Sequence, residues 1–145
     1  MIGVNINTVP VLDLRRFFSH KIIGDRSYSS NKKIINKIGN LSIKLFNKNR
    51  IATVIKHIPG HGLSKKDTHL SLPYIDKKLS YLEKNDFSLF KNKKTLFAMT
   101  AHIVYVSIDK RDCITLSKKG IDYIRDKIGF KNLIISDDIS MKALQ

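Results

Sequence analysis

The chain has 145 residues, of which 42% are hydrophobic, and a formal net charge of +15, so it can form one globular domain but is short for a two-domain enzyme. It lacks the roughly 20 consecutive apolar residues of a membrane span, and its first residues do not resemble the start of a signal peptide. Its single cysteine, Cys113, fits a reducing compartment. We therefore expect a cytoplasmic protein without membrane insertion. Its lysines are scattered beside Asn, Ile or Ser without the interleaved aromatic residues that stack on bases, which argues against a nucleic-acid partner.

The first three predicted elements are a strand, an amphipathic helix and a second strand. Residues from Val4 to Leu12 form an apolar, β-branched run that is typical of a buried strand, and a second such run covers Ile51 to Ile55. Between them, apolar residues recur at three- and four-residue steps opposite a face rich in Lys and Asn, which predicts a helix. The apolar stripe of this helix consists of Ile34, Ile35, Ile38, Leu41, Leu45 and Phe46.

The second half of the chain continues this alternation. Strands are expected over Thr95 to Ala101 and Leu133 to Ile135, and a weaker helix candidate spans Leu79 to Phe90. A further helix begins after Ser117, which suits an N-cap, and ends at Gly129, which suits a C-cap. Its apolar stripe consists of Ile121, Ile124 and Ile128. Continuously apolar strands that alternate with helices indicate a parallel α/β sheet covered on both faces.

Polar side chains gather at the carboxyl ends of these predicted strands. They are Asp13, Lys56, His57, His102, Asp137 and Asp138. In parallel α/β folds, whether open or barrel-shaped, ligands bind and catalytic residues collect at that edge of the sheet. We therefore expect the functional site there.

The segment from Lys56 to His69, after the second predicted strand, carries three histidines, His57, His61 and His69. Its proline and two glycines exclude a helix and allow sharp turns. A metal site is one interpretation, but no helical face aims two of the histidines at one ion and no H-E-x-x-H arrangement is present. A structural interpretation, with histidines that satisfy buried backbone groups, also stays open. We predict no metal site.

Asp67 and His69 are two residues apart, which in an extended turn places both side chains on one side. A carboxylate beside an imidazole favours the imidazolium and holds the ring in one orientation. A histidine with an ordinary pKa of about 6.5 can donate a proton in one step and accept one in the next. The pair is therefore a candidate acid/base for a two-step hydrolysis.

Six segments of the chain together form a pattern shared with a known enzyme family. They are residues 7–13 (NTVPVLD), 23–28 (IGDRSY), 56–62 (KHIPGHG), 67–70 (DTHL), 99–102 (MTAH) and 135–141 (ISDDISM). In order and spacing they resemble the signatures of family-3 glycoside hydrolases of the bacterial β-N-acetylhexosaminidase type. The Asp-Thr-His element is similar to the subgroup in which a histidine is the general acid/base, where most glycosidases use a second carboxylic acid.

This resemblance implies a (β/α)8 barrel and hydrolysis of terminal β-N-acetylglucosaminide bonds with retention of configuration. Asp137 would be the nucleophile that forms a covalent glycosyl-enzyme, and His69, paired with Asp67, would be the acid/base. Arg26, Lys56 and His57 match positions that bind the sugar hydroxyls and the acetamido group. No cofactor is implied, and the substrates would be N-acetylglucosamine-containing glycans, in particular muropeptide fragments from cell-wall turnover.

Some of these residues have weaker or alternative interpretations. The resemblance also implies that Met99 and His102 line the floor of the substrate pocket. Asp137, with its neighbour Asp138, ends an apolar strand and could instead cap the next helix. Arg26 could form a turn ion pair with the residue before it.

The predicted strands are too few for a closed barrel. A complete (β/α)8 barrel has eight strands and about 250 residues, whereas four strands are expected here. We therefore predict that residues 1–145 are a single, truncated barrel domain with about four βα units, strands 3 to 6, and that the isolated chain is inactive or weakly active. A complementary chain could complete the barrel. The alternative is a catalytically dead half-barrel that binds sugar or an anionic polymer or serves assembly.

Overall fold

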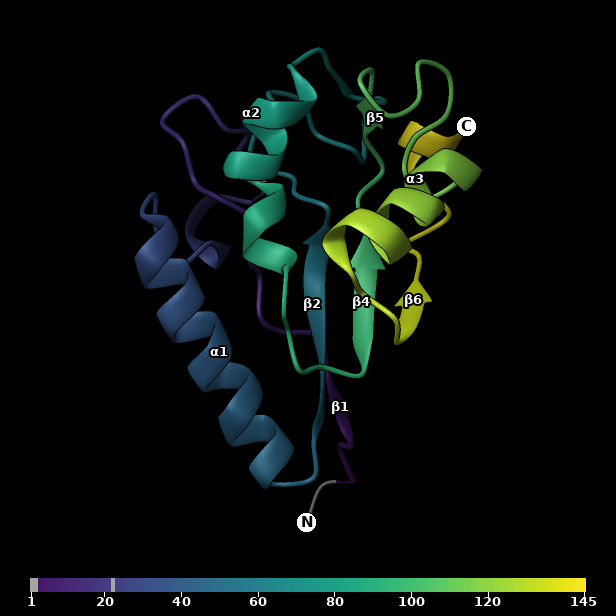
Figure 1. Ribbon diagram of the computed structural model, residues 1–145. Coiled ribbons are helices and arrows are strands. Elements are labelled where there is room, and N and C mark those ends of the chain that lie inside the picture. Colours follow the sequence, from purple (N-terminus) through teal and green to yellow (C-terminus); the bar gives the residue numbers. More distant parts are fainter. Residues whose placement is uncertain (1–2, 22) are drawn as a thin grey trace.

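The main sheet of the protein has four parallel strands in the order β1-β2-β4-β6 (Figure 1). The structure is a computed structural model that describes residues 3–21 and 23–145. The strands of this sheet are β1 (Ile6–Asn7), β2 (Ala52–Ile58), β4 (Phe97–Thr100) and β6 (Leu133–Ile135). A smaller parallel sheet pairs β3 (Tyr74–Ile75) with β5 (Val104–Tyr105). The predicted parallel α/β architecture is confirmed.

Helices connect the strands of the main sheet, as parallel pairing requires. The α-helices are α1 (Lys32–Lys48), α2 (Leu79–Lys84) and α3 (Lys118–Tyr123). The shorter helical turns are η1 (Gly24–Arg26), η2 (Phe87–Phe90), the π-helical η3 (Ile124–Ile128) and η4 (Lys142–Leu144). In Figure 1, α1 runs alongside β2, and α3 lies near β4 and β6.

The first strand is much shorter than the predicted run from Val4 to Leu12. Only Ile6–Asn7 pair with β2 as a strand, and Val11 adds one isolated bridge to Lys56. Pro10 lies between these two pairings, and a proline has no N–H to donate to a ladder. A strand is therefore present in this segment, but it is shorter than predicted.

The second strand is longer than predicted and continues to Ile58 instead of ending at Ile55. Lys56 and His57 are therefore part of β2 and do not begin the loop after it. Both are still near the carboxyl end of the strand. The strand predicted over Leu133 to Ile135 is confirmed as β6.

The predicted N- and C-caps are confirmed by hydrogen bonds and backbone angles. The Ser117 hydroxyl accepts a hydrogen bond from the Gly120 N–H at 2.9 Å, which caps α3. Gly129 ends the following π-helical turn with a φ of 83°, a left-handed conformation that glycine adopts readily. The weaker candidate over Leu79 to Phe90 is instead two separate pieces, α2 and η2, with Asp86 between them.

Helix α1 buries a different face from the one that the sequence predicted. Its fully buried positions are Ile35, Gly39 and Ile43. A Cβ on Gly39 would lie 2.5 Å from the Leu12 side chain, so the helix packs closely on the first strand segment at this glycine. The other apolar residues of the predicted stripe are largely solvent-exposed, with Ile34 at 44%, Ile38 at 38%, Leu41 at 52% and Leu45 at 50% exposure.

One hydrophobic core lies between the helices and the sheet. It includes Ile55 and Ala98 from the sheet, Leu82 from α2, Phe87 from η2 and Ile124 from η3, each of them fully buried. The core therefore holds the strands in place from the helical side.

Within the described residues, no helix is both long and apolar enough to cross a membrane.

The opposite face and the two edges of the main sheet are more open. Phe97 and Leu133 are partners in register, and Phe97 is half-buried while Leu133 is 54% exposed. At the other edge, Ile6 of β1 is 45% exposed. Exposed apolar side chains on an unpaired edge strand are unusual in a complete sheet, because such an edge can pair with a strand of another chain.

Candidate active site

A small cavity lies where β2 and β6 end. Its volume is about 160 Å³. It is lined by Ile23, Arg26, Lys56, His57, His61, Thr68, His69, Asp137 and Met141. The cavity thus brings together five of the predicted site residues, from segments more than a hundred residues apart in the chain.

The buried carboxylate of Asp13 organises one wall of this cavity. It accepts a hydrogen bond from the His57 ring Nδ1 at 2.7 Å and from the backbone N–H of His61 at 2.7 Å. The backbone N–H of His57 also donates to it, at 3.3 Å. Burial alone would raise the pKa of Asp13, but the charge and hydrogen bonds of His57 and His61 hold it below its ordinary value.

The bond to Asp13 determines how His57 faces the cavity. A carboxylate only accepts hydrogen bonds, so Nδ1 of His57 carries the proton of that bond. The other ring nitrogen, Nε2, lies 3.6 Å from Oδ2 of Asp137. Asp13 therefore holds the His57 ring in one orientation, with Nε2 directed at the predicted nucleophile.

Lys56 and Arg26 add two cationic side chains to the cavity that Asp137 also lines. Burial lowers the pKa of the Lys56 ammonium, and the positive charge of Arg26 lowers it further. The carboxylates of Asp137 and Asp13 act in the opposite direction. This arrangement suits a polar, partly desolvated ligand with several hydroxyl or amide groups.

His61 is a buried histidine whose ring is uncharged at neutral pH. Burial lowers its pKa to about 4, although the charge of Asp13 opposes the shift. Its ring packs edge-on against His57, with 5.5 Å between the ring centroids. Its buried Nδ1 has no hydrogen-bond partner among the described residues. His61 therefore combines a structural role, through its backbone bond to Asp13, with a ring that borders the cavity.

The predicted acid/base pair forms, and its histidine, His69, lines the cavity. Nδ1 of His69 donates to Oδ1 of Asp67 at 2.8 Å, and the His69 backbone N–H donates to the same oxygen at 2.8 Å. Burial alone would raise the pKa of Asp67, but the hydrogen bonds of the His69 backbone and ring, together with the charge of that ring, hold it below its ordinary value. The His69 side chain is 54% exposed, so its Nε2 is accessible to a ligand.

Three comparisons with known proteins agree on the family of this chain. The family model for the glycosyl hydrolase family 3 N-terminal domain matches residues 1–145. The chain belongs to glycosyl hydrolase family 3. The predicted partial (β/α)8 barrel is confirmed by solved structures of this family, which superimpose on nearly the whole chain.

Family-3 relatives resemble the chain over almost its full length. A β-hexosaminidase of Neisseria meningitidis serogroup C is 32% identical over 97% of this chain and 40% of the relative. A family-3 β-N-acetylglucosaminidase from Paenibacillus sp. has a TM-score of 0.93 with 26% identity, covering 98% of this chain and 28% of that one. NagZ from Neisseria gonorrhoeae, in complex with N-trifluoroacetyl-D-glucosamine, has a TM-score of 0.86 with 32% identity, covering 95% and 41%. The chain spans about two fifths of the length of the curated relatives it matches.

Two predicted substrate-binding residues of this family-3 chain are not among those that line the cavity. Met99 lies on β4 in register with Lys56 and is half-buried. His102 is buried, and its ring bonds to the Thr115 hydroxyl at 2.7 Å and to the Asp138 carbonyl at 3.0 Å. His102 therefore supports the segment after β6, and contact of either residue with substrate stays a prediction.

The two adjacent aspartates after β6 have different surroundings. The Asp138 carboxylate accepts bonds from the Ser140 N–H at 2.8 Å and the Ser140 hydroxyl at 2.7 Å, which lowers the pKa of Asp138. Asp137 lines the cavity, and its carboxylate accepts the Asp138 N–H at 2.9 Å. Asp138 therefore shapes the turn, while Asp137 faces the cavity.

The glycines of the segment after β2 allow it to pack against neighbouring backbone. A Cβ on Gly62 would lie 2.0 Å from the Leu14 carbonyl oxygen, so only glycine fits there without movement. The Tyr105 hydroxyl donates to the Gly60 carbonyl at 2.5 Å and so holds the turn that follows β2 in place. A buried pair between Arg16 and Asp86, with two bonds of 2.8 and 2.6 Å, supports the same region.

Sequence reasoning gave neither Asp13 nor His61 a specific role in the site. The position of Asp13 at a strand end placed it at the edge of the sheet where the site was expected, but did not show which residues it would bind. His61 is visible only as one of three histidines, because nothing in the local sequence shows that its backbone meets Asp13. In the part of the chain that the structure describes, no group of three or more His, Cys, Asp or Glu side chains could hold a metal ion.

Proposed function

We propose that this chain carries the catalytic residues of a retaining β-N-acetylhexosaminidase that hydrolyses terminal β-N-acetylglucosaminide bonds. The observation that carries the proposal is a single cavity lined by the Asp137 carboxylate and by His69, whose ring is bonded to Asp67. A nucleophile and an acid/base beside one cavity are what a two-step glycoside hydrolysis requires. The family membership of the chain supports this chemistry.

In the first step, Asp137 attacks the anomeric carbon of the sugar. A C–O bond to the carboxylate forms while the glycosidic C–O bond breaks, and Nε2 of protonated His69 gives its proton to the leaving oxygen. Asp67 stabilises the imidazolium before this transfer and holds the ring through Nδ1. The products are a free alcohol and a covalent glycosyl-enzyme.

In the second step, a water molecule replaces Asp137 at the anomeric carbon. His69, now neutral, accepts a proton from the water while the new C–O bond forms and the ester to Asp137 breaks. The sugar leaves with its original configuration because two displacements have occurred. His69 is again protonated, so one group serves as acid and then as base.

Arg26, Lys56 and His57 supply the contacts for the sugar in this proposal. All three line the cavity, and His57 is held by the buried Asp13. The cationic N–H donors of Arg26 and Lys56 suit hydroxyl groups and the carbonyl of an acetamido group. The N-trifluoroacetyl-D-glucosamine complex of the Neisseria gonorrhoeae relative supports an N-acylglucosamine ring as the bound sugar.

We also propose that catalysis needs further polypeptide that completes the barrel. The edge residues Ile6 and Leu133 are exposed, as is an apolar groove of about 520 Å³ along α1. The groove is lined by Ile38, Leu41, Ser42, Leu45, Phe46, Asn49 and Ile51. Additional strands and a neighbouring helix would cover these surfaces and make the substrate site rigid. The isolated chain is expected to be inactive or weakly active.

Turnover of 4-nitrophenyl N-acetyl-β-D-glucosaminide tests the proposal. The 145-residue chain should show little release of nitrophenol alone and clear release when the remaining barrel strands are co-expressed with it. Asp137→Ala should abolish that activity, whereas Asp122→Asn, on the exposed surface of α3, should not change it. Full activity of the isolated chain would refute the need for a partner segment.

Covalent labelling identifies the nucleophile independently of the rate. A 5-fluoro N-acetylglucosaminyl fluoride should leave a sugar adduct on the peptide that contains Asp137, found by mass spectrometry of the completed barrel. An adduct on Asp138, or binding of sugar without any adduct or turnover, would contradict the assignment. The second result would favour a catalytically dead sugar-binding module.

The natural substrates in this proposal are muropeptide fragments in the cytoplasm. The purified, completed barrel should release N-acetylglucosamine from a disaccharide of N-acetylglucosamine and anhydro-N-acetylmuramic acid. Release from chitobiose at the same or a higher rate would argue against a cell-wall fragment as the preferred substrate. This substrate comparison is independent of the nucleophile assignment.

A further inference from the structure

A second, larger cavity lies outside the catalytic cavity. Its volume is about 470 Å³, which is within the range of roughly 300 to 1,000 Å³ that is usual for small-molecule sites. It is lined by Phe18, Leu63, Lys65, Lys66, Pro73, Tyr74, Ile75, Asp76 and Lys77. No residue of this set lines the catalytic cavity, so the two spaces are distinct.

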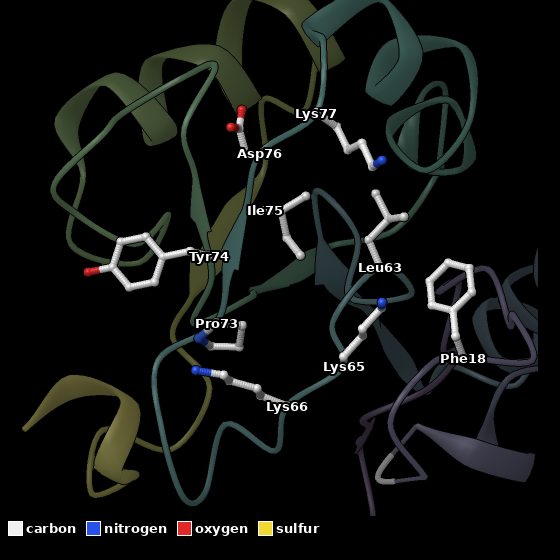
Figure 2. A pocket seen from close by; sticks show the side chains of 9 residues that line it. All are labelled: Phe18, Leu63, Lys65, Lys66, Pro73, Tyr74, Ile75, Asp76 and Lys77. Carbon is white, nitrogen blue, oxygen red and sulfur yellow. The ribbon is translucent and has the colours of Figure 1, made fainter.

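The floor of this second cavity is apolar and well ordered by packing. Leu63 and Ile75 are buried members of the hydrophobic core, at 5% and 8% exposure, and Pro73 is also buried. Figure 2 shows Ile75 next to Leu63, with the Phe18 ring beyond Leu63. Burying an apolar group of a ligand on this floor would remove apolar surface from water on both partners.

The rim of the cavity is cationic. Figure 2 shows the Lys77 and Lys65 side chains on opposite sides of Leu63, and Lys66 next to Pro73. Among the described residues, none of these three ammonium groups forms an ion pair with an acid. Lys65 lies 5.5 Å from the centre of the Phe18 ring, which keeps its charge at the cavity.

The one acidic residue of the lining does not neutralise this rim. In Figure 2 the Asp76 carboxylate points away from the Lys77 ammonium and from Lys65. Three lysines against one aspartate leave the lining with an excess of positive charge. An anion is therefore attracted to the rim, and an apolar group attached to it can reach the floor.

We infer that this second cavity is a binding site for a small organic acid, a carboxylate attached to an apolar body. The carboxylate lies between Lys65 and Lys77, and the apolar body packs on Leu63 and Ile75. Charge complementarity selects the acid, and the floor selects its apolar part. The inference does not depend on hydrolase activity, because binding at this cavity uses none of the catalytic residues.

The test is an NMR titration of the ¹⁵N-labelled 145-residue chain with 4-phenylbutyrate. Saturable shifts should occur at the backbone amides of Leu63, Ile75 and Lys77. 4-Phenylbutanol, which has the same apolar body without the charge, should bind more weakly, and acetate, which has no apolar body, should not bind measurably. Added salt should weaken the binding of the acid because the lysines are exposed.

Matched double variants separate this site from a general effect of charge. Lys65→Gln/Lys77→Gln should weaken 4-phenylbutyrate binding about tenfold, from two exposed charge contacts of a few-fold each. Lys37→Gln/Lys44→Gln removes the same charge from exposed positions on α1 and should leave the affinity unchanged. No saturable shift, equal binding of the alcohol, or equal weakening in both variants would overturn the inference.

Discussion

The segment from β2 to the start of β3 contributes the histidine to each of two histidine–carboxylate pairs, which have nearly equal lengths and opposite surroundings. Asp13 and His57 are joined at 2.7 Å and are almost completely buried. Asp67 and His69 are joined at 2.8 Å, and the His69 side chain is 54% exposed. The same two functional groups therefore form a buried anchor in one place and, in the proposed mechanism, an accessible acid/base in the other.

Burial explains why the two pairs differ in role. Asp13 takes hydrogen bonds from two backbone N–H groups as well as from His57, so its removal would leave several buried donors without a partner. Asp67 takes its bonds from a single neighbour, His69, within a surface turn. A proton-transfer residue needs access to water as well as to the substrate, and His69 is far more exposed than His57.

Removing each aspartate in turn is expected to give the largest contrast between the pairs. Asp13→Ala should lower the free energy of unfolding by about 3 to 5 kcal/mol, because it breaks a buried charged network. Asp67→Ala should lower it by less than about 1 kcal/mol, as an exposed pair does. Urea unfolding followed by circular dichroism measures both. Similar losses for the two variants would show that burial does not distinguish the pairs.

The buried His61, whose backbone N–H bonds to Asp13, should also make stability depend on pH. Folded His61 has a pKa of about 4, whereas the unfolded residue takes up its proton near about 6.5. The unfolded chain therefore binds more protons in this window, and stability should fall by roughly 3 kcal/mol as pH decreases from 6.5 to 4. His61→Gln should flatten this dependence in unfolding experiments at several pH values. His69→Gln is the control, and an equally flat curve for it would contradict the assignment.

The close packing near the buried pair can be tested at Gly62. Gly62→Ala places a methyl group against the Leu14 backbone carbonyl, so it should destabilise the fold by about 1 to 3 kcal/mol. Gly39→Ala meets only the end of the Leu12 side chain and gains helix propensity, so its cost should be smaller. Thermal unfolding of the two variants gives the comparison. The reverse order would mean that the segment after β2 moves more easily than α1.

The smallest expected effect is the direct coupling within the exposed pair. A double-mutant cycle of Asp67→Asn and His69→Gln should give about 0.2 to 1 kcal/mol of coupling in the free energy of unfolding. The coupling should decrease in 0.5 M salt, because screening acts on exposed charges. A larger coupling that is insensitive to salt would place this pair in the same class as Asp13 and His57.

Much of the fold could be predicted because the relevant patterns are local. The strand over Leu133 to Ile135 and the caps at Ser117 and Gly129 follow from residue type and spacing within a few positions. The helix α1 was also predicted from its periodicity. Its buried face was not, because the choice between apolar faces depends on the close approach of Gly39 to Leu12.

In the candidate site too, contacts between residues close in sequence could be predicted, whereas contacts between distant residues could not. Asp67 and His69 are two residues apart, so their contact could be predicted from the turn that joins them. The contact between Asp13 and His57 spans 44 positions and exists only because the first strand segment lies beside β2. Local sequence carries no information about such a pairing unless a known family supplies it.

The sequence by itself determined the family, the parallel α/β order of elements and the presence of an Asp-x-His pair, because each depends on residue types at short spacing. Only the tertiary structure decided that Asp13 anchors His57 and His61, that His61 is buried and uncharged, and that His102 supports the turn after β6. These outcomes depend on burial and on contacts between distant segments. Both are properties of the packed chain, since desolvation and hydrogen bonding act only once those segments meet.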